Sequence, residues 1–406
     1  MIADLRCKIV HSSIRRGFAI ANRQSSTANS LRPRQVIQSL EAQGAPSEGR
    51  AGKLRLDMNE NTAGALPAVV RAVRRAAEGR KLGTYPEYEA ARAALARHFG
   101  VQPRQLLLTN GIDDGLKLIC DTFVDPGDVL LVPTPTFSMY GFFHAVAGGS
   151  TAALPYGRGF RLPLGRLLDA LHPRRGRPPR WLVLANPNNP TGTLIPRAEL
   201  KVILRSTSGT LVVIDEAYFD YSGETVLPWI RQYPNLVVTR TFSKAHALAG
   251  LRLGVMFACR DLADTLRRAQ PVFPVNTLVL AAALESVRHA DSLHKHVRQV
   301  LRARALLCQS LDSLGVPYAP SAANFVFASF GENAPEIAGR LEEQGILVRR
   351  WSHPHLQRYV RIGIGTMTEM RALIDALEGL RGLIPPQDPE EAWRELFEGA
   401  VSNAET

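Results

Sequence analysis

The sequence predicts an α/β protein in which a mostly parallel sheet flanked by helices is followed by a smaller α+β domain. Short apolar runs alternate with helix-like stretches from about residue 83 to residue 275, which is typical of a parallel sheet covered by helices. Polar and apolar residues do not alternate in these runs, which is typical of strands buried on both faces of a sheet. After Pro274 the pattern changes to one long helical stretch followed by short strands and helices, which indicates the second domain.

The elements are expected in the following order. Strands of the first sheet are predicted at Leu106–Thr109, Val129–Val132, Trp181–Ala185, Leu211–Ile214, Leu236–Thr239 and Leu253–Phe257. The second domain is predicted to contain a helix over Leu278–Leu314, a strand over Asn324–Ala328, a helix over Pro335–Gln344, strands over Gly345–Val348 and Tyr359–Gly363, and a helix over Met367–Leu380. We expect a basic leader (1–52), a segment contributing to the small domain and the site (53–82), a large domain (83–275), a small domain (276–385) and a partly helical tail (386–406).

The composition excludes several classes of protein. Hydrophobic residues make up 45% of the chain and charged residues 21%, as in ordinary folded proteins. No apolar run approaches the roughly 20 residues that cross a bilayer, so we expect no membrane span. Much of the net charge of +12 lies in the first 40 residues, and the remainder is too mildly basic to predict nucleic-acid binding. Four widely spaced cysteines predict neither a disulfide framework nor a metal site, and favour a cytoplasmic location.

The N-terminal stretch contains arginine and serine and few acids, as transit peptides do. It has no apolar core and no small-residue cleavage site, so secretion is not predicted. We interpret it as a flexible leader or an extended start of translation, with organelle import as the alternative.

Polar residues follow several predicted strands at the edge where open parallel sheets bind ligands. Asn110–Gly115 follows the first strand and leads into an apparent helix, whose free N–H groups and dipole favour a phosphate. Asn186–Gly192 follows the third strand, and its two X-Pro steps stiffen a loop that carries three amides. Either motif alone is also compatible with an ordinary turn.

An acid and a base follow the next two strands. Burial of the Asp215 carboxylate is costly unless it faces a cation, a metal or a protonated ring. Burial of Lys244 would depress its pKa and favour Schiff-base chemistry. Hydroxyls of the same loop and Arg252 can bind a dianionic phosphate. Any one of these residues alone is compatible with a surface position, but the convergence of four strand ends on one crevice predicts a functional site.

Together these motifs resemble a known family. The strings NPNNPTG (Asn186–Gly192), DEAY (Asp215–Tyr218) and TFSKAHALAGLR (Thr241–Arg252) are similar to those of fold type I aminotransferases that use pyridoxal 5'-phosphate (PLP), most closely the histidinol-phosphate aminotransferases. The resemblance runs from about Leu56 to Leu380 and includes Asn59-Glu60-Asn61, Tyr85-Pro86, Pro135–Tyr140, Ser321–Phe325 and Val360–Thr366. It implies a seven-stranded large domain that binds PLP and uses no metal.

The resemblance assigns catalytic and cofactor roles to the matching residues. Lys244 would hold PLP as a Schiff base and then move the substrate proton, without which no turnover is expected. Asp215 would keep the pyridine nitrogen protonated. Asn189 and Tyr218 would hydrogen-bond the phenolate oxygen, and Phe137 would stack on the ring where the family usually has tyrosine.

The phosphate of PLP would be held by backbone N–H groups at a helix start and by side chains of the lysine loop. These ligands are Ile112, Asp113, Thr241, Ser243 and Arg252. Tyr85 would reach the phosphate of a neighbouring subunit, so the resemblance implies a homodimer.

Arg361 would bind the α-carboxylate of the substrate or of 2-oxoglutarate, and Arg349 and Asn59 would line the substrate pocket. The implied reaction converts histidinol phosphate and 2-oxoglutarate to imidazole-acetol phosphate and glutamate, in histidine biosynthesis. The alternatives are an aromatic amino acid aminotransferase, a threonine-phosphate decarboxylase on the same scaffold, and a non-catalytic PLP-binding protein.

Three places depart from the family pattern. His246 stands where the family usually has tyrosine, and Ala247 where it usually has glycine. Ala269–Asn276 stands where the family often has an arginine and a Pro-Tyr-Asn-Val run close to the substrate. The contacts to the substrate phosphate are therefore expected to differ from those of the family.

Overall fold

The computed structural model describes residues 32–38, 40 and 48–398. The chain forms two compact units, Met1–Leu40 and Glu41–Thr406. The described part of the first unit contains one short helix, α1 (Gln35–Gln38). The expectation of a flexible leader concerns residues that lie largely outside the described ones. All elements below belong to the second unit.

A seven-stranded sheet organises the larger part of this unit. Its strands are β2 (Leu106–Thr109), β3 (Val129–Thr134), β4 (Ser150–Pro155), β5 (Trp181–Ala185), β6 (Leu211–Asp215), β7 (Leu236–Thr241) and β8 (Gly254–Ala258), in the order β2-β8-β7-β6-β5-β3-β4. β8 runs antiparallel to its two neighbours, β2 and β7, and the other neighbouring pairs of the sheet are parallel. The mostly parallel sheet is therefore confirmed. The sequence analysis missed β4, because this edge strand is rich in small and hydroxyl residues and is only partly buried.

Helices cover both faces of this sheet. They are α2 (Pro67–Ala76), α3 (Glu89–Phe99), α4 (Gly111–Phe123), α5 (Met139–Ala147), α6 (Leu164–Leu171), α7 (Arg197–Ser206), α9 (Arg260–Ala269) and α10 (Thr277–Arg288). The short helix α8 (Phe219–Ser222) instead contributes Tyr221 to the separate hydrophobic cluster that contains Phe325. Short 3-10 helices lie at Gly79–Gly83, Pro103–Gln105, Arg158–Phe160, Leu227–Arg231 and Ala249–Leu251. Alternate strand residues pack on opposite sides: Val183 and Val213 face the layer of α4, α5 and α9, whereas Leu184 and Ile214 face that of α2, α3, α6, α7 and α10.

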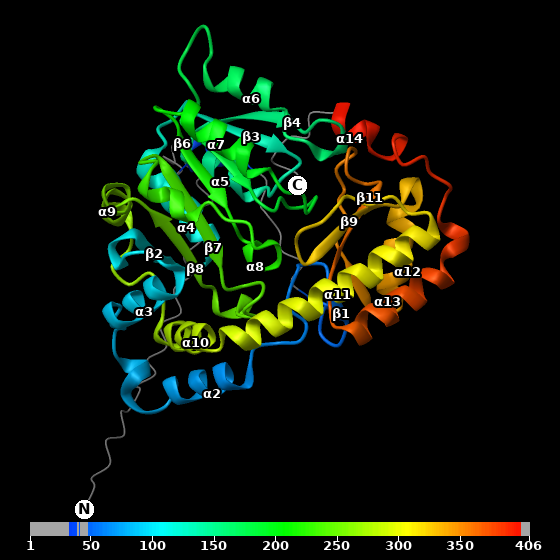
Figure 1. The fold of residues 1–406 in the computed structure, drawn as a ribbon, viewed down its shortest axis with the longest axis horizontal. Coiled ribbons are helices and arrows are strands. Elements are labelled where there is room, and N and C mark those ends of the chain that lie inside the picture. The colour runs from blue at the N-terminus through cyan, green and yellow to red at the C-terminus, as the bar shows by residue number, and fades with distance from the viewer. Residues whose placement is uncertain (1–31, 39, 41–47, 399–406) are drawn as a thin grey trace, which may run out of the picture. The chain divides into compact units, whose positions relative to one another are not determined.

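A second group of elements follows α10 and is seen together around β9 and β11 in Figure 1. It contains α11 (Ala290–Leu314), β9 (Phe325–Ser329), α12 (Ala334–Glu343), β10 (Ile346–Val348), β11 (Tyr359–Gly363) and α13 (Met367–Gly379), with 3-10 helices at Gly331–Asn333 and Arg381–Leu383. β9 and β11 pair antiparallel. β10 pairs in parallel with β1 (Leu54–Leu56), so this strand, which precedes α2, is joined to the group by backbone hydrogen bonds.

The long helix predicted over Leu278–Leu314 is wrong as a single element. The structure ends α10 at Arg288 and begins α11 at Ala290, with His289 between them at φ −105° and ψ 39°. No glycine or proline marks the break, and apolar residues continue on both sides of it, so the helical pattern alone does not reveal it.

The predicted tail is packed in its described part. A 3-10 helix (Glu391–Trp393) leads into α14 (Arg394–Glu398). Trp393 and Leu396 are buried with Phe327 of β9, and the Trp393 ring stacks on Tyr359 of β11 with centroids 5.2 Å apart. The described helices include none that is long and apolar enough to cross a bilayer.

Candidate active site

The carboxyl ends of β2, β5, β6 and β7 lie at one edge of the large sheet. β5, β6 and β7 are parallel, and β2 points the same way because β8 is antiparallel to both β2 and β7. The loops that carry the predicted site residues therefore converge there.

Asp215, the last residue of β6, is a buried carboxylate with neutral partners. Its Oδ2 accepts a hydrogen bond from the Tyr140 hydroxyl at 2.6 Å, and its Oδ1 accepts from the Thr239 hydroxyl at 2.8 Å and the Ala217 N–H at 3.1 Å. Burial raises the pKa of Asp215, although the three hydrogen bonds act to lower it. Within residues 48–398, no basic side chain forms an ion pair with it.

Lys244, just beyond β7, lies near one backbone carbonyl, an aromatic ring and both arginine and acidic side chains. Its Nζ donates to the Met58 carbonyl at 2.9 Å and lies 5.8 Å from the centroid of the Tyr218 ring. Burial lowers the pKa of Lys244 to about 8, and the charge of Arg361 acts in the same direction. The sequence-based expectation of a depressed lysine pKa agrees with this environment.

The predicted phosphate ligands lie together between the start of α4 and the lysine loop. Arg252 approaches the Ser243 hydroxyl at 3.4 Å and the Asp113 carboxylate at 3.3 Å. The Thr241 hydroxyl accepts from the Ser243 N–H at 3.0 Å. Gly111 has a φ of +79°, and a Cβ there would lie 2.4 Å from Arg252 Nη2. Glycine therefore permits the arginine to lie against the start of α4, next to Ile112 and Asp113.

Arg361, in the middle of β11, brings a buried cation to the same site. Its guanidinium donates to the Asn189 side-chain oxygen and to the Asp57 carbonyl, the latter at 2.6 Å, while its Nε has no partner among the residues that the structure describes. Burial lowers the pKa of Arg361 to about 10. Arg349 is the backbone neighbour of Arg361 through two hydrogen bonds of 2.9 and 3.0 Å. A second arginine therefore lies next to the first.

Asn59 joins the N-terminal segment to the tyrosine that follows β6. Its amide donates to the Tyr218 hydroxyl at 3.0 Å, and its buried Oδ1 has no hydrogen-bond partner in the described part of the chain. The residue has a φ of 54°, a left-handed conformation that asparagine tolerates better than most residues. The Asn324 side chain donates to the Asn59 carbonyl at 3.1 Å and so fixes this turn.

Two predicted cofactor residues lie differently from the others. Phe137 is half-buried and packs edge-on against Tyr140, with ring centroids 5.5 Å apart. Tyr85 is 77% exposed and stacks on Phe273 at 4.2 Å. Within the described chain it makes no hydrogen bond to Thr241, Ser243 or Arg252, so its expected role still depends on a second subunit.

The departures next to the lysine have local explanations. The His246 ring packs against Phe242 with centroids 4.3 Å apart, and its Nδ1 lies 2.7 Å from the Ser286 hydroxyl. Ala247 has a φ of 57°, in the left-handed region where glycine carries no Cβ penalty. The chain therefore keeps the backbone conformation that a glycine would favour at this position.

The sequence analysis did not identify the groups that hold Asp215, Arg361 and Lys244 in place. Tyr140 and Thr239 hold Asp215, and the carbonyls of Asp57 and Met58 hold Arg361 and Lys244. Tyr140 could have been found, because it lies in a matched motif at the start of a helix after β3. The two carbonyls carry no side-chain signal, so no sequence pattern identifies them.

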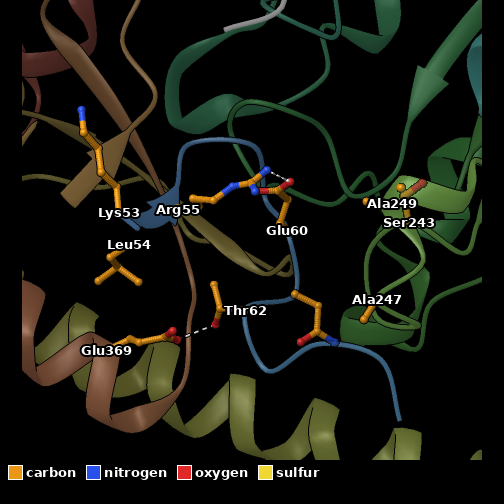
Figure 2. A pocket seen from close by; sticks show the side chains of 11 residues that line it. Lys53, Leu54, Arg55, Glu60, Thr62, Ser243, Ala247, Ala249 and Glu369 are labelled. Atoms are coloured by element: carbon orange, nitrogen blue, oxygen red, sulfur yellow. Dashed lines mark hydrogen bonds and ion pairs between the residues drawn. The ribbon is translucent and has the colours of Figure 1, made fainter. Parts of the chain in front are cut away.

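A cavity of about 340 Å³ opens beside the lysine loop. Figure 2 shows Ser243 and Ala247 on one side of it and Arg55, Glu60 and Glu369 on another. Ser243 and Ala247 line this cavity but Lys244 and Asp215 do not, so the cavity adjoins the lysine and the acid without containing them. Within the described residues, no group of three or more histidine, cysteine or acidic side chains could hold a metal ion.

Comparisons with known proteins agree with this geometry. The family model for aminotransferase class I and II matches residues 51–377. Histidinol-phosphate aminotransferase 2 of Methylococcus capsulatus is 36% identical over 340 residues, covering 82% of this chain and 91% of that protein. Histidinol-phosphate aminotransferase 1 of Pseudomonas aeruginosa is 34% identical, covering 81% of this chain and 93% of that protein.

A solved structure is also similar to this chain in sequence and fold. The histidinol-phosphate aminotransferase of Sinorhizobium meliloti in complex with pyridoxal-5'-phosphate is 29% identical to this chain, with a TM-score of 0.79, and the match covers 89% of this chain and all of that one. The fold, the family model and the curated relatives agree, and the chain belongs to the class I and II aminotransferase family.

Proposed function

We propose that this chain is a PLP-dependent aminotransferase that converts histidinol phosphate and 2-oxoglutarate to imidazole-acetol phosphate and glutamate, in histidine biosynthesis. The observation that carries the proposal is a pair of groups at neighbouring strand ends: the buried Asp215, which has no cationic partner among the described residues, and the half-buried Lys244, whose pKa is depressed. The names of the curated relatives support the choice of histidinol phosphate.

The residues present fit PLP. A buried carboxylate that lacks a cation is stabilised by a protonated pyridine nitrogen, which Asp215 would bind. The N–H groups of Ile112 and Asp113, the hydroxyls of Thr241 and Ser243, and Arg252 form a donor set suited to a phosphate dianion. Tyr218 and Asn189 would donate to the phenolate oxygen, and Phe137 would cover the ring. When bound, PLP supplies an electron-withdrawing ring that accepts the electron pair left on the donor carbon.

Lys244 would bind the cofactor aldehyde and carry the proton. Because its pKa is about 8, part of the amine is unprotonated near neutral pH, as a nucleophile and a general base require. The Met58 carbonyl accepts from the lysine and so orients its Nζ. The proton would be taken from the donor carbon by this nitrogen.

Arg361 and Arg349 would bind the anionic group of each substrate. Histidinol phosphate carries a phosphate and no carboxylate, whereas 2-oxoglutarate carries two carboxylates. Two adjacent arginines offer bidentate donors for both kinds of anion. Asn59, whose buried oxygen next to Tyr218 has no partner within the described residues, would contact the substrate from the N-terminal segment.

A cytoplasmic homodimer is part of the proposal. The stacked pair of Tyr85 and Phe273 is an exposed aromatic surface that a second subunit would cover. From there Tyr85 would reach the cofactor phosphate of that subunit. The mass of the purified protein in solution tests this directly, and a monomer that is fully active would contradict it.

A half-reaction screen tests the substrate. The PLP-loaded enzyme is mixed separately with histidinol phosphate, phenylalanine, tyrosine and glutamate, and loss of the yellow cofactor absorbance is followed. We expect histidinol phosphate to react fastest. A clear preference for phenylalanine would make the chain an aromatic aminotransferase, and carbon dioxide release from threonine phosphate would make it a decarboxylase. PLP binding without amino transfer to any keto acid would indicate a non-catalytic role.

Lys244→Ala tests the reaction type. The variant should fold and show no turnover, and borohydride reduction of the wild-type holoenzyme followed by peptide mapping should place the pyridoxyl label on Lys244. A label on another residue would contradict the proposal.

A further inference from the structure

The loop Asp57–Asn61, which we call the N-terminal loop, contacts the proposed lysine, tyrosine and substrate arginine at once. Asp57 O accepts from Arg361 at 2.6 Å, and Met58 O accepts from Lys244 at 2.9 Å. The Asn59 amide donates to the Tyr218 hydroxyl at 3.0 Å. The Asn61 amide donates to the carbonyl of Ala245, the neighbour of Lys244, at 3.0 Å.

The loop has little regular structure of its own. It follows the three-residue strand β1, which is fixed to β10, and precedes α2. Its turn contains a left-handed residue, and two of its carbonyls point to cationic side chains instead of backbone N–H groups. Its conformation therefore depends on side-chain contacts.

Arg50 supplies the strongest of those contacts. Its Nη2 and Nε donate to the two oxygens of the Asp57 carboxylate at 2.7 and 3.1 Å, a bidentate pair in which the side chains are 15% and 8% exposed. The same Nη2 reaches Glu60 at 3.1 Å, and Arg55 binds the other oxygen of Glu60 at 2.5 Å. Figure 2 shows the Arg55–Glu60 pair from close by. Both acidic residues of the loop are thus held by arginines that precede it.

We propose that Arg50 is a positioning residue, which through its bidentate pair with Asp57 holds the N-terminal loop so that the loop carbonyls orient Arg361 and Lys244. The inference rests on the proposed roles of these two residues. Arg50 touches neither of them. Its effect passes through the backbone of Asp57 and Met58, because planar guanidinium–carboxylate pairing fixes the orientation of the aspartate as well as its distance.

The pair explains why a buried aspartate lies so close to the substrate arginines. The negative charge of Asp57 acts to raise the pKa values of both Arg349 and Arg361 against the effect of burial. Without Arg50, the Asp57 carboxylate would be free to turn toward those cations and compete with the substrate anion. Arg50 therefore keeps the acid directed away from the proposed anion site.

The test compares holoenzymes of wild type, Arg50→Met, Lys53→Gln and the double variant Arg50→Met/Asp57→Asn. Arg50→Met should raise the KM values for both histidinol phosphate and 2-oxoglutarate by about tenfold, because both substrates use Arg361. Lys53→Gln removes one positive charge and the ion pair with Glu342 from the same segment, and should leave both KM values unchanged. Deuterium uptake at residues 57–61 should rise in Arg50→Met and stay at the wild-type level in Lys53→Gln.

The double variant separates positioning from folding. It removes both charges, so no buried charge is left unpaired, and it should fold while still taking up deuterium faster in the loop. If Arg50→Met lowers only the active fraction, with wild-type KM values and wild-type uptake in the loop, the proposal is overturned. The affinity for 2-oxoglutarate can be measured with any amino donor that the wild type accepts, so failure of the histidinol-phosphate proposal would leave this test intact.

Discussion

Asp215 and Glu216 are consecutive buried carboxylates at the end of β6, but one has neutral partners and the other a cationic partner. Glu216 accepts from Arg240 Nε and Nη2 at 3.0 and 2.9 Å, from the Val226 N–H at 2.7 Å and from the Thr225 hydroxyl. Among the described residues, Asp215 accepts only from two hydroxyls and one N–H, all neutral. Burial raises the pKa of both.

The difference distinguishes a structural charge from a functional one. The counter-ion of Glu216 is part of the fold: Arg240 is itself held by the ring of Phe219, whose centroid lies 3.5 Å from the arginine Cζ. Asp215 has hydrogen-bond donors that fix its orientation and no counter-ion from the described chain. A buried acid that is oriented but not neutralised is suited to bind a cationic group from outside the chain.

Asp215→Asn should produce the largest effect. The amide keeps the shape and hydrogen-bonding capacity of the side chain but cannot stabilise a protonated pyridine nitrogen. We expect kcat/KM to fall by about a hundredfold to a thousandfold, with a melting temperature close to that of wild type. Steady-state kinetics and thermal unfolding of the same preparation measure both quantities. Wild-type activity in this variant would contradict a functional role for Asp215 and thus the proposed difference between it and Glu216.

Glu216→Gln should act on stability instead. It leaves the Arg240 guanidinium buried without its counter-ion, which costs about 3 kcal/mol or more in the free energy of unfolding. The folded fraction should retain its KM values, because Glu216 faces Arg240 and Thr225 and no proposed substrate ligand. Urea unfolding and kinetics below the transition measure the two effects. A KM change without a loss of stability would contradict the structural role.

The contrast between Asp215 and Glu216 also shows which parts of the site can be predicted from the sequence alone. Strand ends predicted the acid, the lysine and the phosphate ligands, because β2, β5, β6 and β7 are short apolar runs with polar residues directly after them. Asp215 and Glu216 could not be separated by pattern, since the counter-ion of Glu216 comes from β7, 24 residues later. The contacts of Lys244 and Arg361 to carbonyls of the N-terminal loop are long-range and involve backbone atoms, so only the folded chain reveals them.

Lys244 is the cationic counterpart of Asp215, and Lys244→Met should stabilise the cofactor-free protein. The folded lysine has a pKa of about 8, below the value of about 10.4 in the unfolded chain. Between these two values the unfolded chain binds more protons, so the stability of wild type rises with pH. The advantage of methionine should therefore be greatest below pH 8, roughly 1–3 kcal/mol, and should shrink as the pH rises toward 10.

Urea unfolding of the cofactor-free proteins at several pH values measures this advantage. Lys117→Met is the matched control, because Lys117 is exposed and pairs with Asp121 on α4. It should show no comparable stabilisation. An advantage of Lys244→Met that does not change between pH 7 and pH 10 would mean that the lysine is not the titrating group.

Tyr140→Phe should have the smallest effect and tests how Asp215 is oriented. The variant loses one hydrogen bond to the carboxylate, and since this bond lowers the pKa of Asp215, that pKa should rise further. PLP binding should weaken by about fivefold, near 1 kcal/mol, as measured by cofactor titration. Tyr221→Phe is the matched control, because the Tyr221 hydroxyl is buried and has no partner within the described chain. Equal PLP affinities of the two variants would show that the neutral donors around Asp215 serve only to bury it, whereas a selective loss in Tyr140→Phe would show that they prepare it for the cofactor.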